Sequence, residues 1–409
     1  MRKRILSFEL AASFAMLTLT GTLTPAWAVK TATLHNFNNF QGSQPTGVVI
    51  GPDGNLYGTT INGGPDAIGG GTVYELTPDS EGQWFETMVL DFGLVGAFPN
   101  GNLIFDNAGN IYGTSQQGTG VVQVCGCCVC GNTGLVFKLT HNPRGRGWDE
   151  TSLLSFVNYG TVMFPSSGLV RDSAGNLYGL SSMSDGTQAG CVFEASPAAD
   201  GGWSSTIVTH GEGMVSGPLA VDGNGNFYGT VTYSAGEPNG NVWKLNKNDG
   251  TWTELFTFPG GNGGANPVDQ GGLILDAAGN IYGTTQNGGV SGKGTVFELS
   301  PGGDGTWTEK VLYSFDGRHG GNPSAGVISD TTGTLYGEAS SGGDGNSGVV
   351  FQLTPKGDGS WAYATLRSFH GPDGNGPSYG LILDAAGNLY GTTWAGGTYG
   401  NGTVFEVTP

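Results

Sequence analysis

The sequence predicts an all-β fold, a seven-bladed β-propeller of four-stranded antiparallel blades whose ring is closed by the N-terminal strand. A motif that reads Gly-Leu-Ile-Leu-Asp-Ala-Ala-Gly-Asn-Ile-Tyr-Gly-Thr-Thr at 272–285 recurs in seven near-copies. Each copy opens a unit of four short runs that suit β-strands, and the run that the last unit lacks is present at the other end of the chain. Together these observations indicate a closed ring of repeats.

The repeat is clearest in the Tyr-Gly pairs, which are separated by 55, 66, 50, 54, 54 and 54 residues. A period of this length indicates structural units that stack on one another. Positions that recur in every unit are those that the fold needs, so the motif predicts architecture and names neither a ligand nor a reaction. The pairs begin at Tyr57, Tyr112, Tyr178, Tyr228, Tyr282, Tyr336 and Tyr390.

In the fifth unit the four runs are Gly272–Leu275, Asn280–Thr285, Gly294–Leu299 and Trp307–Phe315. Val, Ile, Tyr, Phe and Thr dominate them, and the breaks are too close together for helices, so all four are predicted to be β-strands. The segment Asp276–Asn280 joins the first two as a tight hairpin, because Asp bonds its own backbone and Gly tolerates a positive φ. The unit is therefore a four-stranded blade.

The two ends of the chain favour a closed ring over an open solenoid. The seventh unit stops at 409 without the Trp-led fourth strand that the other six possess, and Val29–Phe37 supplies a strand of the right kind. Ring closure requires such an N-terminal strand, whereas an open solenoid would need polar caps. A β-solenoid is the alternative, although its repeats are usually shorter. The Trp-led strands are Trp84–Phe92, Trp148–Phe156, Trp203–His210, Trp252–Phe258, Trp307–Phe315 and Trp361–Phe369.

Residues 1–28 have the pattern of a secretory signal peptide, with a basic start at Met1–Arg4, a mostly apolar stretch at Ile5–Leu23 and a small-x-small site at Ala26–Ala28. An uncleaved membrane anchor is the alternative. Cleavage after residue 28 predicts a secreted protein, extracellular or periplasmic, that does not insert in a membrane. Residues 29–409 then form a single domain. Its blades are expected at 47–92, 101–156, 168–210, 217–258, 272–315, 326–369 and 380–407, the last together with 29–37.

The chain is strongly acidic, with 15 Lys and Arg against 33 Asp and Glu, a net charge of −18 that becomes −20 once residues 1–28 are removed. Such a field repels phosphate backbones and anionic lipids, which argues against nucleic acid and membranes as partners. We expect a monomer that owes its solubility outside the cell to this charge. The 78 glycines recur at regular offsets and mark turns between strands.

The units resemble the GloVer (Gloeobacter/Verrucomicrobia-type) tandem repeats of secreted bacterial proteins that carry various C-terminal anchors. The resemblance is carried by runs such as those at Gly380–Thr393, Gly402–Val407 and Trp361–Phe369, and it covers essentially all of 29–409. It implies a secreted, propeller-like protein without a known activity. Because nothing follows the last repeat, we expect free secretion rather than anchoring.

Five cysteines break the repeat. Cys125, Cys127, Cys128 and Cys130 lie in a lengthened second-to-third loop of the second blade, and Cys191 begins the third strand of the next blade. Outside the cell we expect disulfides, a local bridge and one to Cys191, that fix a flexible insertion. A soft ion such as Cu(I) or Zn(II) held by the cysteine loop, or free thiols, are the alternatives. No other cofactor is predicted.

Function is sought where the copies differ, on the face where the fourth-to-first and second-to-third connections open. His319 and His370 lie in successive fourth-to-first loops, with Asp316 and Asp373 nearby and Arg318 beside the first histidine. We expect these two loops to lie side by side. The histidines and aspartates are candidate catalytic acid/base or metal-binding residues, and Arg318 is a candidate ligand for a carboxylate. Exposed loop histidines without a function are the simpler alternative.

Aromatic residues of the second-to-third loops form another candidate ligand-binding set, Tyr233, Trp394 and Tyr399. Aromatic faces beside amides and carboxylates suit sugar rings.

The strand-leading Trp residues and the Tyr of each Tyr-Gly pair are regular and are predicted to pack blade against blade. The Asp that recurs once per hairpin is predicted to be a turn residue, because one Asp is too sparse for a calcium site. His210 takes a slot that most units give to Phe and is predicted to pack in the core.

The leading interpretation is a secreted, non-enzymatic propeller that binds an extracellular glycan or a surface protein through variable loops on one face. The alternative is a carbohydrate-active enzyme, a polysaccharide lyase or hydrolase, that works on the same face with His319 and His370 as acid and base. A structural envelope protein is a second alternative. The sequence contains no nucleophile elbow, phosphate-cradling loop or His-Glu-x-x-His motif.

Overall fold

A computed structural model describes residues 29–65, 69–93, 98–117, 123–125, 128–130, 134–142, 147–156, 163–183, 190–210, 215–234, 236–268 and 270–409. Within this part of the chain every named element is a β-strand. The described residues contain no helix that is long and apolar enough to span a membrane. The predicted signal peptide lies outside them.

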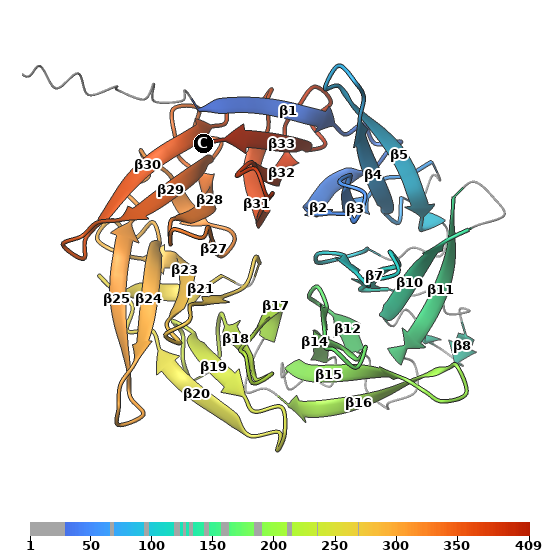
Figure 1. The fold of residues 1–409 in the computed structure, drawn as a ribbon, viewed down its shortest axis with the longest axis horizontal. Coiled ribbons are helices and arrows are strands. Elements are labelled where there is room, and N and C mark those ends of the chain that lie inside the picture. The colour runs from blue at the N-terminus through green and yellow to red at the C-terminus, as the bar shows by residue number, and fades with distance from the viewer. Residues whose placement is uncertain are drawn as a thin grey trace, which may run out of the picture.

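The strands form seven antiparallel blades arranged in a ring, which confirms the predicted β-propeller (Figure 1). In blades 1 to 6 the chain passes from an inner strand near the axis to an outer strand at the rim, and the next blade begins again at the axis. In blades 3, 5 and 6 the inner strand is broken into two pieces that pair with the same second strand. An additional hairpin extends from blade 2.

The strand bounds are as follows. Blade 1 contains β2 (Ser43–Ile50), β3 (Leu56–Asn62), β4 (Thr72–Pro78) and β5 (Trp84–Asp91); blade 2 contains β6 (Ile104–Phe105), β7 (Ile111–Ser115), β10 (Leu135–His141) and β11 (Trp148–Ser155), with the hairpin β8 (Gln123–Cys125) and β9 (Cys128–Cys130). Blade 3 contains β12 (Met163–Pro165), β13 (Val170–Arg171), β14 (Leu177–Met183), β15 (Gly190–Pro197) and β16 (Trp203–His210); blade 4 contains β17 (Val215–Val221), β18 (Phe227–Val231), β19 (Asn241–Leu245) and β20 (Trp252–Thr257). Blade 5 contains β21 (Gly264–Pro267), β22 (Ile274–Leu275), β23 (Ile281–Gly288), β24 (Thr295–Pro301) and β25 (Trp307–Ser314); blade 6 contains β26 (Gly321–Pro323), β27 (Ile328–Ser329), β28 (Leu335–Ser341), β29 (Val349–Pro355) and β30 (Trp361–Ser368). Blade 7 contains β31 (Asn375–Leu383), β32 (Leu389–Ala395), β33 (Thr403–Thr408) and, as its outer strand, β1 (Lys30–Asn36).

The N-terminal strand closes the ring, as predicted. β1 pairs antiparallel with β33, from Lys30 opposite Thr408 to Asn36 opposite Thr403. Side chains then cross the seam to blade 1, because the Phe37 ring contacts Tyr74 with centroids 4.9 Å apart. The first and last described strands of the chain therefore belong to one blade (Figure 1).

Aromatic side chains pack each blade on the next, which confirms the interpretation of the regular Trp and Tyr residues. The leading Trp of an outer strand contacts the Tyr of the preceding blade, as for Trp361 and Tyr282 with centroids 6.5 Å apart. Edge-to-face Phe pairs repeat the arrangement closer to the middle of the sheets, as for Phe315 and Phe351 at 5.2 Å. The same Trp to Tyr contact recurs in the pairs Trp148 and Tyr57, Trp203 and Tyr112, and Trp84 and Tyr390. Such aromatic pairs bury large areas in preferred geometries and hold the blades in a continuous core.

The recurring Asp is a turn residue, as predicted. In blade 5 one carboxylate oxygen of Asp276 accepts hydrogen bonds from the N–H groups of Ala278 and Asn280, and the other accepts from the Asn280 amide and the Tyr282 hydroxyl. Partial burial opposes ionisation, yet these hydrogen bonds hold the pKa of Asp276 below its usual value. Each such Asp links the hairpin to a core tyrosine, and both of its carboxylate oxygens accept hydrogen bonds from within the blade.

Inner strands begin earlier than the repeated motif indicates. In blade 5 the inner strand starts with β21, whose last residue is Pro267. The residue before this proline, Asn266, has a φ of 56°. The Asn266 N–H donates to the carbonyl of Asn239 in the preceding blade at 2.6 Å, and a Cβ on Gly240 would lie 2.6 Å from Cδ of Pro267. Pro and Gly are typical of loops in sequence. Here they instead form a tight contact between neighbouring blades.

Candidate functional site

The fourth-to-first and second-to-third connections open on one face of the ring, which we name the loop face. Several of the exposed large hydrophobic side chains among the described residues lie in these connections. They are Phe40, Tyr233, Val290 and Tyr399, and Trp394 is exposed beside them near the end of strand β32, just before such a connection. The three aromatic residues predicted to bind ligand are therefore exposed on the loop face, although none of them lines either of the two pockets described below.

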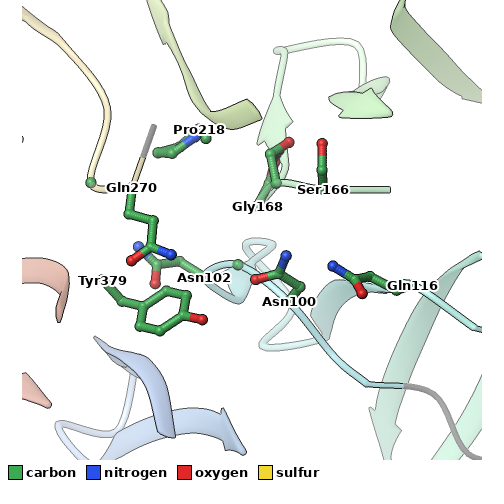
Figure 2. Close-up of a pocket in the computed structure, with 12 residues that line it drawn as sticks. Asn100, Asn102, Gln116, Ser166, Gly168, Pro218, Gln270 and Tyr379 are labelled. Atoms are coloured by element: carbon green, nitrogen blue, oxygen red, sulfur yellow. Dashed lines mark hydrogen bonds between the residues drawn. The ribbon is translucent and has the colours of Figure 1, made fainter. Parts of the chain in front are cut away.

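The first pocket, the axial pocket, has a volume of about 230 Å³ and lies where inner strands of five blades meet. Figure 2 shows side chains from different blades around a common space. No lining residue carries a charge; the side chains are amides and hydroxyls, and Gly and Pro residues complete a surface that is more apolar than polar. The lining consists of Asn100, Gly101, Asn102, Gln116, Ser166, Ser167, Gly168, Gly217, Pro218, Gln270, Gly271 and Tyr379.

Glycines bring the inner strands close together around the axial pocket. A Cβ on Gly101 would lie 2.1 Å from the backbone nitrogen of Gly168 in the next blade. A Cβ on Gly380 of blade 7 would lie 3.1 Å from Cα of Gly271 in blade 5. Backbones from non-adjacent blades therefore approach each other near the axis, which positions polar side chains from several blades around one small space.

Asn102 and Tyr379 give the axial pocket its most distinctive chemistry. The Oδ1 atom of Asn102 is buried and has no hydrogen-bond partner in the described structure. Tyr379 has a φ of 74° and lies where the pairing of β31 with β32 shifts register, and both residues contact Gly47 closely enough to exclude a Cβ there. A non-glycine residue with positive φ is uncommon and is found where surrounding structure enforces it. The backbone at Tyr379 is therefore held in an unusual conformation beside the pocket.

The second pocket, the rim pocket, has a volume of about 440 Å³ and lies over blade 6 on the loop face. It brings together His319, His370 and Arg318, three of the residues predicted from the sequence, and adds Asp344. The side of blade 6 contributes Thr365, Leu366, Arg367 and Ser368. Both predicted loops therefore border one space.

The intervening loop of blade 6, residues 342–348, lies between the two predicted loops and contacts each. The N–H of Gly343 donates to the Arg318 carbonyl at 3.2 Å. On the other side, a Cβ on Gly345 would lie 2.1 Å from the Phe369 carbonyl and 2.8 Å from Cα of His370. The loops are close through this third element, which the sequence did not reveal.

Aspartates fix both histidine loops. Asp316 accepts hydrogen bonds at 2.7 Å from the N–H of His319 and from its ring Nδ1, and the first of these lowers the pKa of the Asp316 carboxyl most. Asp373 accepts from the N–H of His370 at 2.8 Å. The predicted acidic residues thus act first as loop caps. Neither Asp316 nor Asp373 lines the rim pocket.

Arg367 joins the rim pocket to the closing strand. Its guanidinium donates to the Ala32 carbonyl at 2.8 Å and to the Thr33 hydroxyl at 3.0 Å, both in β1, and lies 3.4 Å from the Asp373 carboxylate. The ring of Phe369 packs under it, with the guanidinium carbon 4.5 Å from the ring centroid. Burial lowers the pKa of Arg367 and the Asp373 charge opposes that shift. This residue was not singled out from the sequence, although an arginine stands here where most other blades have an apolar residue.

The structure shows neither the predicted disulfide to Cys191 nor a metal site among the described residues. The side chains of the cysteine loop, including Cys127, lie outside the described residues. The Cys191 thiol is free and buried in the core of blade 3, so the expected bridge to Cys191 is not present, and burial raises its pKa to about 12. No cluster of three or more His, Cys, Asp or Glu side chains suited to a metal occurs in the described part of the chain. His210 ends β16, and its side chain is not among those described.

Comparison with known proteins matches this architecture. The Gloeobacter/Verrucomicrobia repeat family matches residues 120–308 and 269–409. No curated protein matches the sequence. Among solved structures, an oligogalacturonate lyase in complex with manganese aligns with a TM-score of 0.52 at 12% identity, covering 93% of this chain and 90% of that chain. An oligogalacturonate lyase from Vibrio parahaemolyticus aligns with a TM-score of 0.51 at 9% identity, covering 93% of each.

A puromycin hydrolase aligns with a TM-score of 0.52 at 14% identity and covers 90% of this chain but 52% of that one. At such low identities the likeness extends to the fold alone. The family match is different, because it spans residues 120–409 and so covers more than half of the chain. The chain belongs to the Gloeobacter/Verrucomicrobia repeat family.

Proposed function

We propose that this protein is a carbohydrate-binding propeller that acts outside the cytoplasm and holds a neutral sugar ring in the axial pocket. The observation that carries the proposal is the lining of that pocket, which is rich in amides and hydroxyls and has no charged side chain. Sugar hydroxyls pair with such groups, and a neutral ligand needs no counter-charge.

Two further observations support a sugar ligand, one in the axial pocket and one on the loop face. The buried Asn102 Oδ1 is an acceptor without a donor, and a ligand hydroxyl would satisfy it. Exposed aromatic rings at Trp394 and Tyr399 offer faces against which further sugar units can pack. A surface protein that carries a glycan would meet the same face.

The test is a thermal-shift and calorimetric screen of the protein against neutral mono- and oligosaccharides. A ligand at 100 times its dissociation constant stabilises the fold by about 2.7 kcal/mol. We expect Asn102→Ala and Gln270→Ala to weaken binding, while Asn248→Ala, in an exposed turn at the other end of blade 4, leaves it unchanged. A screen without any sugar response would favour a protein partner or a structural role instead, and release of cleaved polymer products would contradict a binding-only function.

A further inference from the structure

We infer that the rim pocket is a second binding site, for a sugar acid, in which Arg318 holds the carboxylate while Asp344 and the two histidines meet hydroxyl groups. The site is separate from the axial pocket and takes a different class of ligand. It therefore does not depend on the function proposed for the axial pocket.

Four side chains around the rim pocket have unused hydrogen-bonding capacity. Within the described structure, the Arg318 guanidinium and the Asp344 carboxylate have no ion-pair or hydrogen-bond partner, although both line the same space. The His319 ring uses Nδ1 on Asp316, which leaves Nε2 available, and the His370 ring has no partner. An unpaired guanidinium and an unpaired carboxylate in one pocket, flanked by two imidazoles, can satisfy a ligand that carries both an acid group and hydroxyls.

The charge around the pocket selects the class of ligand. Asp316 is occupied by the backbone and ring of His319, and Asp373 by the His370 N–H and Arg367. Among the described residues that line the rim pocket, Arg318 then remains as a cation without an ion pair and can bind a carboxylate through two parallel N–H···O bonds. Asp344 repels a ligand with several negative charges but accepts hydrogen bonds from hydroxyls, which favours a singly charged, hydroxylated acid over a phosphate.

The walls of the rim pocket are already ordered. Gly317 and Gly320 form a bridge that tightens the first loop, and the Tyr363 hydroxyl donates to the His319 carbonyl. Tyr363 is itself stacked on Tyr313, with centroids 4.1 Å apart and ring planes 10° from parallel. A ligand that enters such a site does not need to order the loops, so little affinity is lost to conformational entropy.

The experiment is a calorimetric or NMR titration of the protein with glucuronate, its neutral isostere glucuronamide, and glucose. We expect glucuronate to bind and glucuronamide to bind at least tenfold more weakly. Arg318→Gln should weaken glucuronate binding at least tenfold, because a charge-assisted hydrogen-bond pair is lost. The matched control Arg171→Gln removes an exposed arginine beside the Asp172 turn at the opposite end of a blade, and it should leave the affinity unchanged.

Asp344→Asn separates a sugar-acid site from a plain anion site. If Asp344 accepts ligand hydroxyls, the substitution weakens glucuronate binding; if the pocket only attracts negative charge, the substitution strengthens it. The inference is overturned by stronger binding in Asp344→Asn, by equal affinity for glucuronamide, by an Arg318→Gln protein that binds as the wild type does, or by no glucuronate binding at all. Asn102→Ala, which tests the axial pocket, should leave glucuronate binding intact, so failure of one site is distinguishable from failure of the other.

Discussion

Glu338 is a buried acid at a position where most other blades have threonine. In blade 5 the equivalent Thr284 hydroxyl donates to the Ala325 carbonyl of the next blade at 2.7 Å. Glu338 reaches the next blade differently, because its Oε2 accepts from the Gly380 N–H at 3.1 Å while its Oε1 is buried without a partner. Burial raises the pKa of Glu338 to about 8, against the opposing effect of the Gly380 hydrogen bond. Burial therefore favours the protonated, neutral form of this acid near neutral pH.

Glu338→Gln should make the stability of the protein less dependent on pH between about 4.5 and about 8. The folded-state pKa lies above the unfolded value of 4.5, so the folded state binds more protons between these values and the wild type loses stability as pH rises from about 4.5 to about 8. As the pH rises through this window, the free energy of unfolding of the variant should increase relative to that of the wild type, by at most about 1.4 kcal/mol per pH unit. Urea unfolding at pH 4, 6 and 8 measures it.

The exposed Glu81, in a turn of blade 1, provides the control, since Glu81→Gln removes a charge without touching the core. An advantage of Glu338→Gln that is constant across the three pH values would contradict a buried titrating acid.

The sequence alone was enough to assign a structural role to some residues but not to others. The Asp of each hairpin and the strand-leading Trp could be assigned, because they recur and a recurring residue serves the fold. Glu338 and Arg367 are visible as departures from the repeat when copies are aligned by position. Their burial and their partners are not visible, because both partners, Gly380 and β1, come from the next blade.

At the scale of single elements, the hairpin between first and second strands depends on one carboxylate. In blade 7 Asp384 accepts from the N–H groups of Ala386 and Asn388, the Asn388 amide and the Tyr390 hydroxyl. Asp384→Ala leaves these donors without their partner. We expect a loss of about 1–3 kcal/mol in the free energy of unfolding, measured by urea denaturation at pH 7.

Asp358→Ala is the matched control for this hairpin. Asp358 caps a fully exposed turn of blade 6 through Ser360 alone, where water replaces the lost bonds. Equal effects of the two substitutions would show that the link to the core tyrosine contributes nothing.

Elements were predictable where their signal is local. Second, third and fourth strands have apolar patterns bounded by turns, and they are found as β23, β24 and β25 in blade 5. Inner strands were placed too late, because their first segment, such as β21, is short, polar and ends in Pro. This segment is held in a strand conformation by its contact with the preceding blade, and a local sequence pattern cannot predict such a contact.

At the scale of the whole molecule, stability depends on closing the ring. Deleting Val29–Phe37 removes the outer strand of blade 7, the Phe37 contact with blade 1 and the acceptors of Arg367. We expect the melting temperature of the whole domain to fall in one cooperative transition, because each blade packs on both neighbours. A calorimetric scan against the protein from which only residues 1–28 are absent measures the change, and an unaltered scan would contradict closure by β1.

The ring itself was predictable because a strand missing at one end of the repeat is present at the other. The axial pocket was not, since Asn102, Gln270 and Tyr379 come from blades 2, 5 and 7 and meet only when the circle is complete. The rim pocket was predictable in part. Its two histidine loops could be placed on one face from strand order, whereas the packing of Gly345 between them requires the folded structure.

The pairing of β1 with β33 also imposes an order of events on biosynthesis. Of the strands that the structure describes, the one that leaves the ribosome first has its partner in the one that leaves last. Blades in the middle of the chain can assemble as they emerge, but the edge offered by β33 and the strand meant for it stay apart until residue 408 has been made. A chain of this design remains an open arc until β33 has been made, and only then can it become a circle.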